Sequence, residues 1–158
     1  MNIVDARKFY WAAPPFEEQP LYRAPADVQA GWIELAKQAQ AELERFGLPA
    51  TVVTPDAAKT FGSPAGALII VNDKRPFGVT LYWEPPLTGS VEFKNVVTGK
   101  AMTSPLFRYV GKGQSAMEEA TMLILSAAGF ETAKESGEGN SFEYRVLMPP
   151  LTPIIERG

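Results

Sequence analysis

The residues best suited to chemistry form a glycine-interrupted string, Arg108-Tyr109-Val110-Gly111-Lys112-Gly113, that precedes a strongly apolar stretch. Glycines between a strand and a helix let backbone N–H groups approach an anion, and the positive end of the helix dipole adds to the attraction. We therefore predict a strand-to-helix turn here, with phosphate binding as the chemistry that such a turn supports. The glycine spacing differs from that of a Walker loop, which ends in Gly-Lys followed by Ser or Thr.

The pattern R-x-x-G-x-G resembles the pyrophosphate-binding turn of the GNAT acetyltransferase superfamily, which follows a central strand and holds acetyl coenzyme A. The resemblance implies an acyl-CoA-dependent acyltransferase whose cofactor-binding residues are Arg108, Gly111 and Gly113. Two carboxylates, Glu118 and Glu119, occupy the predicted first turn of the following helix, where they already complement its dipole. The acyltransferase is therefore our alternative hypothesis rather than the leading one.

Other catalytic chemistry is restricted because the chain contains no histidine and no cysteine. Their absence excludes histidine-based triads, thiol nucleophiles and the commonest zinc ligands. Glu84 and Glu92 are predicted to share one face of a sheet, and paired acids serve glycoside hydrolysis. Their predicted neighbours, Thr80 and Lys94, indicate a solvated cross-strand network instead. We expect a non-catalytic protein with no metal site, no catalytic residue and no cofactor.

Aromatic residues beside prolines are the best candidates for binding a protein partner. Residues 8–26 combine prolines with aromatics, which predicts an extended N-terminal segment that lies against an apolar surface. The string Trp83-Glu84-Pro85-Pro86-Leu87 places an aromatic and a leucine at a rigid loop, and such residues supply interface energy without catalytic groups. The predicted partner-binding residues are Tyr10, Trp11, Phe16, Trp83, Glu84 and Leu87.

Charge and composition narrow the class of partner. The chain has 158 residues, a formal net charge of −3 and a pI near 5.1, so no global basic field attracts nucleic acid or an anionic membrane. The N-terminus lacks the pattern of a signal peptide and no stretch is apolar enough to span a bilayer, which predicts a cytoplasmic location. We expect a small acidic protein that acts by binding a protein partner and can do so as a homodimer. Inhibitors, immunity proteins and phage or mobile-element accessory proteins are of this physical kind. A small-ligand-binding module is a second alternative.

Two helices are predicted to position these residues. The first runs over 27–46, with Asp27 as N-cap and Gly47 at the left-handed C-terminal position. The second runs over 114–128, where Ser115 and Glu118 form a capping box and Gly129 ends the helix.

Strands and a brief helix complete the predicted fold. A short helix is expected over 54–62. The predicted strands cover 50–54, 67–71, 77–84, 90–97, 102–110, 130–135 and 141–148. We predict one α+β domain over 1–158, in which a mostly antiparallel sheet of five to seven strands packs against the two helices. A proline-rich tail, 149–158, follows the last strand.

Overall fold

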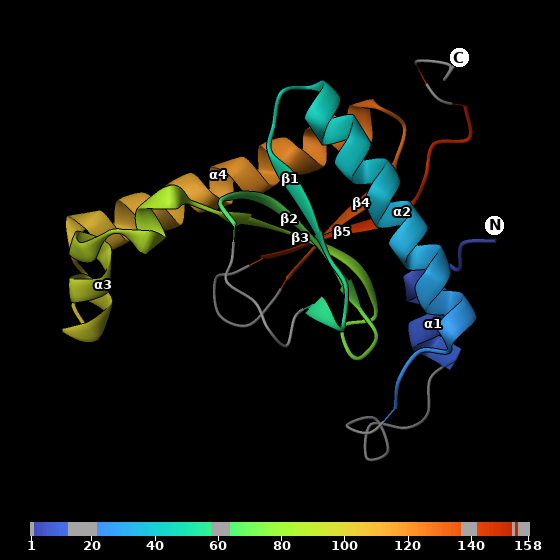
Figure 1. Ribbon diagram of the computed structural model, residues 1–158, viewed down its shortest axis with the longest axis horizontal. Helices are drawn as coiled ribbons and strands as arrows, with labels where there is room; N and C mark the ends of the chain where they lie inside the picture. Colours follow the sequence, from blue (N-terminus) through green and yellow to red (C-terminus); the bar gives the residue numbers. More distant parts are fainter. Residues whose placement is uncertain (1, 13–21, 58–63, 137–141, 153, 155–158) are drawn as a thin grey trace.

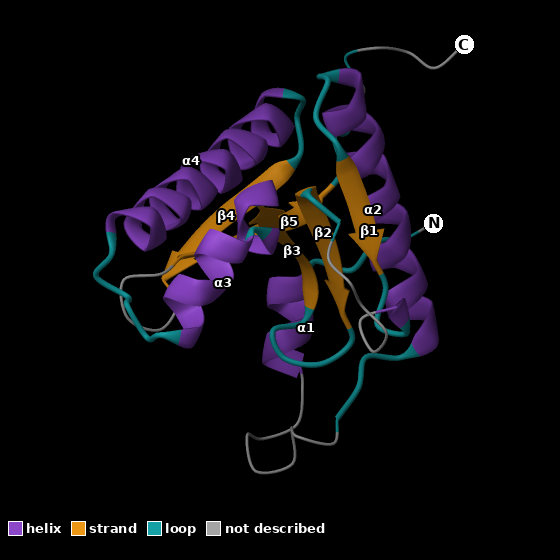
Figure 2. Ribbon diagram, turned by 60° about the vertical axis from the view of Figure 1, so that its left-hand side comes forward, coloured by secondary structure: helices purple, strands orange, loops and turns teal. Residues whose placement is uncertain are grey.

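The protein has an α+β fold in which helices pack on a five-stranded sheet (Figures 1 and 2). The structure is a computed structural model that describes residues 2–12, 22–57, 64–136, 142–152 and 154. Among these residues the strands are β1 (Ala50–Val53), β2 (Gly66–Asn72), β3 (Gly78–Glu84), β4 (Glu131–Ser136) and β5 (Phe142–Met148). The helices are α1 (Ala6–Ala12), α2 (Ala26–Arg45), the 3-10 helix η3 (Pro86–Gly89), α3 (Val91–Thr98) and α4 (Pro105–Ala127).

The described strands lie in the order β1-β2-β3-β5-β4, and all neighbours are antiparallel except β1 and β2, which are parallel. The predicted fold class, a mostly antiparallel sheet against helices, is therefore confirmed. The predicted hairpin over 67–84 is also confirmed, with Ile69 opposite Leu81. The second neighbour of β3 was predicted at 90–97, but Leu81 faces Tyr144 of β5 instead.

Helix α2 covers one face of the sheet and carries the centre of the core. Trp32, Leu35 and Leu43 are buried in one cluster with the inward residues of β2 and β3. Gly47 follows the helix at φ +91°, the left-handed conformation predicted from the sequence. Two details differ: Pro25 rather than Asp27 is the N-cap, and Phe46, predicted to end the buried stripe, is 70% exposed.

The strand predicted at 90–97 is wrong, because these residues form α3. The Ser90 hydroxyl accepts the backbone N–H of Phe93 at 3.1 Å, which caps the first turn of the helix. Valine and phenylalanine at 91, 93, 96 and 97 fit an alternating pattern and a helical one about equally. The Ser90 cap is therefore the local feature that favours a helix over a strand here.

The strand predicted at 102–110 is also wrong, since α4 begins at Pro105 rather than near 114. Ser104 is its N-cap, with the hydroxyl accepting the N–H of Phe107 at 3.1 Å, and Pro105 occupies the first turn. Gly111 and Gly113 lie inside the helix and do not break it, although each costs about 1 kcal/mol relative to alanine. Ser115, predicted as a cap, lies well inside α4.

The N-terminal segment predicted as extended over 8–26 is helical at its start. Residues 6–12 contain no proline and form α1, where Phe9 packs edge-on against Trp32 at 5.4 Å and against Phe77 at 5.0 Å. Residues 13–21 lie outside the described residues, as do 58–63, on which most of the predicted brief helix falls. Residues 149–152 of the tail form neither helix nor strand.

Strand β5 lies between β3 and β4, and its Arg145 is only 4% exposed although it alternates with the apolar residues Tyr144 and Val146. Its guanidinium donates to the Phe77 carbonyl and pairs with Glu135 at 3.4 Å. Strand position in the sheet, which the local pattern does not encode, determines this burial.

Candidate functional site: a groove beside a helical projection

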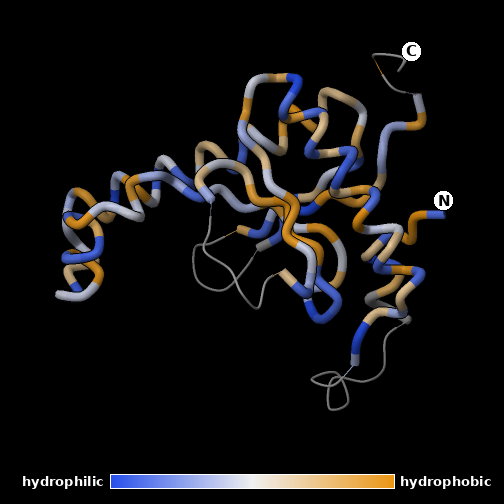
Figure 3. The backbone as a smooth tube through the Cα atoms, in the orientation of Figure 1, coloured by the Kyte–Doolittle hydropathy of each residue, from blue (hydrophilic) through white to orange (hydrophobic). Residues whose placement is uncertain are grey.

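A helical projection leaves the sheet at the end of β3. It comprises η3, α3 and the first half of α4, residues 86–114, and Figure 1 shows it extending away from the strands. Helix α3 packs against η3 and α4, and none of its eight residues, all described, is buried. Figure 3 shows hydrophobic residues interleaved with hydrophilic ones along the projection. The projection exposes large apolar side chains. They are Leu87 (41% exposed), Val91 (69%), Val97 (40%), Met102 (47%) and Tyr109 (66%).

Ring stacking, a side-chain hydrogen bond and two helix caps hold the projection together. The Phe93 and Phe107 rings stack in parallel, with centroids 6.2 Å apart and an interplanar angle of 4°. The Arg108 guanidinium donates to the Thr103 carbonyl at 2.8 Å, which satisfies a backbone acceptor before α4. Together with the Ser90 and Ser104 caps, these contacts order two helices that have little buried surface of their own.

A groove opens where the projection joins the sheet. One wall is the end of β3 and the loop that follows, and the other wall is one side of α4. Its volume is about 190 Å³. The lining residues are Trp83, Pro85, Leu87, Tyr109, Val110, Gly113, Gln114 and Met117.

The helical wall of the groove follows from the periodicity of α4. Tyr109, Gly113 and Met117 are spaced four residues apart and therefore lie on one side of the helix. No atom lies within 4 Å of the position that a Cβ on Gly113 would occupy. Packing within the chain thus does not require glycine at 113, and its absent side chain widens the groove.

A half-buried carboxyl, Glu118, lies next to this wall. Burial raises its pKa from the ordinary value of 4.5 to about 7, although the Trp83 backbone N–H donates to the carboxylate and opposes the shift. Burial also raises the pKa of Tyr82, whose hydroxyl is hydrogen-bonded to Gln114 and lies near the charges of Glu84 and Glu118. Protonation of Glu118 near neutral pH therefore changes the charge beside Trp83, whose side chain lines the groove.

The groove brings together some predicted residues and not others. Trp83 and Leu87 line it, while Glu84 is adjacent and accepts a hydrogen bond from the Thr88 hydroxyl. Tyr10 and Trp11 belong to α1, which lies on the other side of the molecule in Figure 1, and Phe16 is outside the described residues. The element that carries Tyr10 and Trp11 therefore lies away from the groove that Trp83 and Leu87 line.

The predicted phosphate-binding turn requires a correction. Arg108, Gly111 and Gly113 lie inside α4, and the expected strand before them is the start of that helix. Interior N–H groups of a helix are bonded to carbonyls four residues earlier, so they are not presented to an anion. The expected face shared by Glu84 and Glu92 is also wrong, because Glu92 lies in the first turn of α3.

The groove residues that the sequence did not indicate are Tyr109, Val110, Gln114 and Met117. A helix drawn from Ser104 would have placed three of its apolar side chains on one side. The missed signal was Ser104-Pro105, which has the same cap-then-proline form used to predict a helix at 54.

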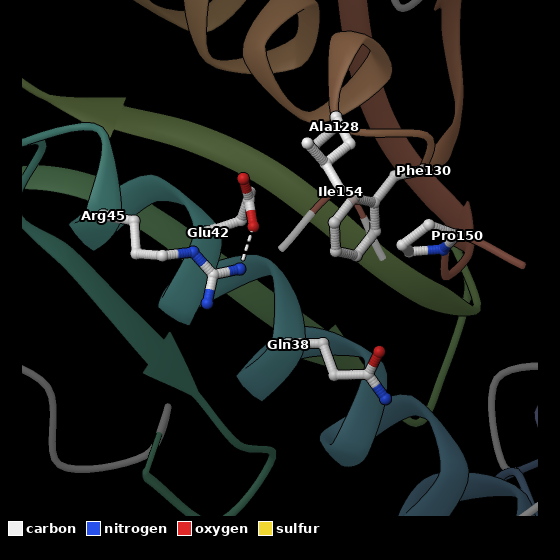
Figure 4. A pocket seen from close by; sticks show the side chains of 7 residues that line it. All are labelled: Gln38, Glu42, Arg45, Ala128, Phe130, Pro150 and Ile154. Carbon is white, nitrogen blue, oxygen red and sulfur yellow. Dashed lines mark hydrogen bonds and ion pairs between the residues drawn. The ribbon is translucent and has the colours of Figure 1, made fainter. Parts of the chain in front are cut away.

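A second pocket, of about 230 Å³, lies between α2 and the start of β4 (Figure 4). Its α2 side is polar, and Arg45 there pairs with Glu42 on the same helix. Phe130 and Ala128 contribute an apolar side. Its other lining residues are Gln38, Pro150 and Ile154. The ion pair neutralises the charges of the two side chains at this pocket. The helical projection, in contrast, has an exposed apolar surface.

Comparison with known proteins gives no relative: no family model, curated protein or solved structure matches the chain. None of the described helices is both long and apolar enough to cross a membrane. Within the described part of the chain, no three carboxylates gather in a way that would hold a metal ion. The groove itself is therefore the basis for a functional proposal.

Proposed function

We propose that this protein is a non-catalytic binding protein that recognises another protein through the groove and the helical projection. The observation that carries the proposal is an apolar groove of about 190 Å³ beside exposed Leu87 and Tyr109. A dry apolar cavity of about 150 Å³ accommodates a benzene ring, so the groove has room for one aromatic or leucine side chain. Such anchors in desolvated pockets supply most of the energy of protein interfaces.

The alternative functions find less support. Small-molecule sites usually occupy about 300–1,000 Å³, which is larger than the groove, so a protein side chain fits it better than a typical ligand. A GNAT-like acyltransferase would need a turn that presents free N–H groups at 108–113, where the chain is helical. The small-ligand module is therefore the second candidate, and the acyltransferase is the third.

The proposal is tested with a displayed library of short random peptides, selected on the protein as it stands. We expect enriched peptides to contain a bulky apolar residue, because that residue fills the groove. Gly113→Leu fills the same space, and we expect it to weaken binding of the enriched peptides by about tenfold or more.

The matched control is Gly111→Leu, which makes the same exchange two residues away on α4. Gly111 also has open space around it but does not line the groove. It should leave peptide affinity unchanged, while circular dichroism shows that both variants remain folded. Equal affinity of the protein and Gly113→Leu for the enriched peptides, or the absence of any enrichment, would contradict the proposal.

A further inference from the structure

Glu118 joins α4 to β3 at the point where β3 loses one of its strand neighbours. The pairing of β3 with β5 ends at Leu81, opposite Tyr144, whereas its pairing with β2 continues to Glu84. Among the described residues of β5, none pairs with Trp83, and the Trp83 backbone N–H donates instead to the Glu118 carboxylate. A side chain of α4 thus supplies the acceptor that a neighbouring strand supplies elsewhere in the sheet.

A second hydrogen bond joins the same two elements and also involves a wall of the groove. Gln114 lies one helical turn before Glu118 on α4, and its side chain is hydrogen-bonded to the Tyr82 hydroxyl of β3. Gln114 lines the groove from α4, and Trp83 lines it from β3. Tyr82 also lies close enough to Glu118 for their charges to interact. The two walls of the groove are therefore held together through Glu118 and its neighbour Tyr82.

Burial is the main influence on the Glu118 carboxyl group. It raises the pKa from 4.5 to about 7, and the hydrogen bond from Trp83 opposes the shift. On β3 the titratable neighbours are Tyr82, whose pKa is raised above its ordinary value of 10, and Glu84, whose charge acts on Tyr82. Because Tyr82 keeps its proton near pH 7, Glu118 is the member of this pair that changes charge there.

Other elements that pack against α4 carry charged groups that pair elsewhere. Lys134 of β4 pairs with Glu119 at 3.8 Å, Arg145 of β5 pairs with Glu135 at 3.4 Å, and Arg45 of α2 pairs with Glu42. Helix α3, which carries Glu92 and Lys94, packs against α4 within the projection. Among the described residues, no arginine or lysine forms an ion pair with Glu118. The Trp83 N–H is therefore its favourable contact, and no cation offsets its burial.

The direction of a pH effect follows from the two environments open to this carboxyl group. A Glu118 side chain that leaves the contact and enters water has a pKa near the ordinary 4.5, whereas in the contact its pKa is about 7. The proton is therefore bound more tightly in the contact, and its loss favours the conformation in which Glu118 is solvated. The contact is retained below pH 7 and weakens above it.

We infer that Glu118 is a positioning residue of the groove: its carboxyl group joins α4 to β3, and loss of its proton loosens this contact and weakens ligand binding. The inference rests on the proposed function and adds the regulation of the same site. A ligand that requires Trp83 and Gln114 in place must in turn tighten the hold of Glu118 on its proton, because coupling between two sites is reciprocal. Binding and protonation thus favour the same conformation.

The experiment compares the affinity of the most enriched library peptide at about pH 6 and about pH 8.5. The peptide has blocked termini and contains no histidine or cysteine, so it does not itself titrate in this range. We expect the affinity to be about fivefold or more lower at the higher pH. Glu118→Gln retains an acceptor for the Trp83 N–H but cannot ionise, so its affinity should be the same at both values. Glu119→Gln, the matched control, leaves Glu118 in place and should keep the full decrease.

A measurement without ligand tests the contact itself. The Trp83 backbone amide resonance, followed by two-dimensional NMR across the same pH range, should titrate with a midpoint near pH 7. The titration should persist in Glu119→Gln and disappear in Glu118→Gln. A Trp83 resonance that does not move with pH would overturn the inference.

The outcomes separate the inference from the proposed function. A peptide whose affinity is independent of pH, or falls equally in Glu118→Gln, would overturn the inference; if Gly113→Leu still weakens that peptide, protein binding is retained. The absence of any enriched peptide would contradict the proposed function and remove the effect on binding. The Trp83 titration would still support or overturn the contact between α4 and β3.

Discussion

Two regions of the molecule, the sheet together with α2 and the helical projection, contain similar types of residue. The first region buries its apolar side chains and the second exposes them. In the sheet and α2, Trp32, Phe77 and Ile69 are at most 1% exposed, whereas Val91 and Tyr109 of the projection are more than 60% exposed. Charges differ likewise, because Arg7, Lys134 and Arg145 pair with carboxylates, whereas among the described residues no carboxylate forms an ion pair with a cation of the projection. Folding thus buries the apolar side chains of the first region, whereas the second region leaves apolar and charged side chains exposed.

The comparison predicts that a substitution affects stability in the first region and binding in the second. Trp32→Ala should have the largest effect, lowering the free energy of unfolding by about 3–5 kcal/mol. The Trp32 ring packs edge-on against Phe9 and its indole N–H donates to the Val4 carbonyl at 2.9 Å, so all these contacts are lost. Urea unfolding followed by circular dichroism measures the change; a loss below about 1 kcal/mol would place the core elsewhere.

Glycine provides a direct contrast between the regions. Gly78 has φ +99°, and a Cβ there would lie 2.4 Å from the Cβ of Ala6 in α1. Gly78→Ala should therefore destabilise the protein by about 2–3 kcal/mol, combining backbone strain with a clash. Gly47→Ala is the matched control, since Gly47 has φ +91° with no atom within 4 Å of its Cβ position. Thermal unfolding should show a smaller loss for this control, of about 1 kcal/mol, and equal losses would exclude the clash with Ala6.

Glu118→Gln tests the electrostatics at the junction of the two regions. Because the folded pKa, about 7, lies above the ordinary 4.5, the folded protein binds the proton more tightly and loses stability as pH rises between these values. The Gln variant should be more stable by about 1 kcal/mol at pH 8, a figure reduced for solvent screening of this half-exposed group, and similar at pH 4. Denaturant unfolding across this range measures it. Glu119→Gln, at the next and exposed position of α4, is the matched control.

Glycines of the projection should behave in the opposite sense to Gly78. Gly113→Ala and Gly111→Ala should each raise the free energy of unfolding by about 0.5–1 kcal/mol, because alanine favours the helix and both Cβ positions are open. Chemical denaturation measures the gain. A loss of stability in either variant would mean that the chain itself requires glycine there.

Val91→Ala should have the smallest effect, a change in unfolding free energy below about 0.5 kcal/mol, since Val91 is 69% exposed. The same urea titration used for Trp32→Ala gives the direct comparison. A loss above about 1 kcal/mol would show that α3 belongs to the folded core and would remove the distinction between the two regions.

The sequence predicts the sheet and α2 better than the projection for a physical reason. Helix α2 has one apolar stripe, and β2 and β3 are joined by a clear turn, so a single periodicity fits each element. At 90–110 the valines and aromatics fit both strand and helix patterns, and Gly111 and Gly113 suggest a turn. Only the caps at Ser90 and Ser104 distinguish the two, and each depends on one hydroxyl.

The same reason explains why only part of the candidate site could be predicted from the sequence. Trp83 and Leu87 flank a proline pair whose rigidity is evident from the sequence, and both line the groove. Tyr109 and Met117 join them only when 105–127 is one helix, because only then do they lie on one side of it. The burial of Arg145 depends on the strand order, which is a long-range property.

Helix α4 is one continuous element of 23 residues, about 34 Å long at 1.5 Å per residue. Its second half buries Leu125 against the sheet, and its first half forms a wall of the groove. Different residues of the same helix line the groove and pack against the sheet. Substitutions in the first half can therefore occur without disturbing the packing of the second half. Under the proposed function, substitutions in the first half of α4 would therefore change what the protein recognises while its architecture is retained.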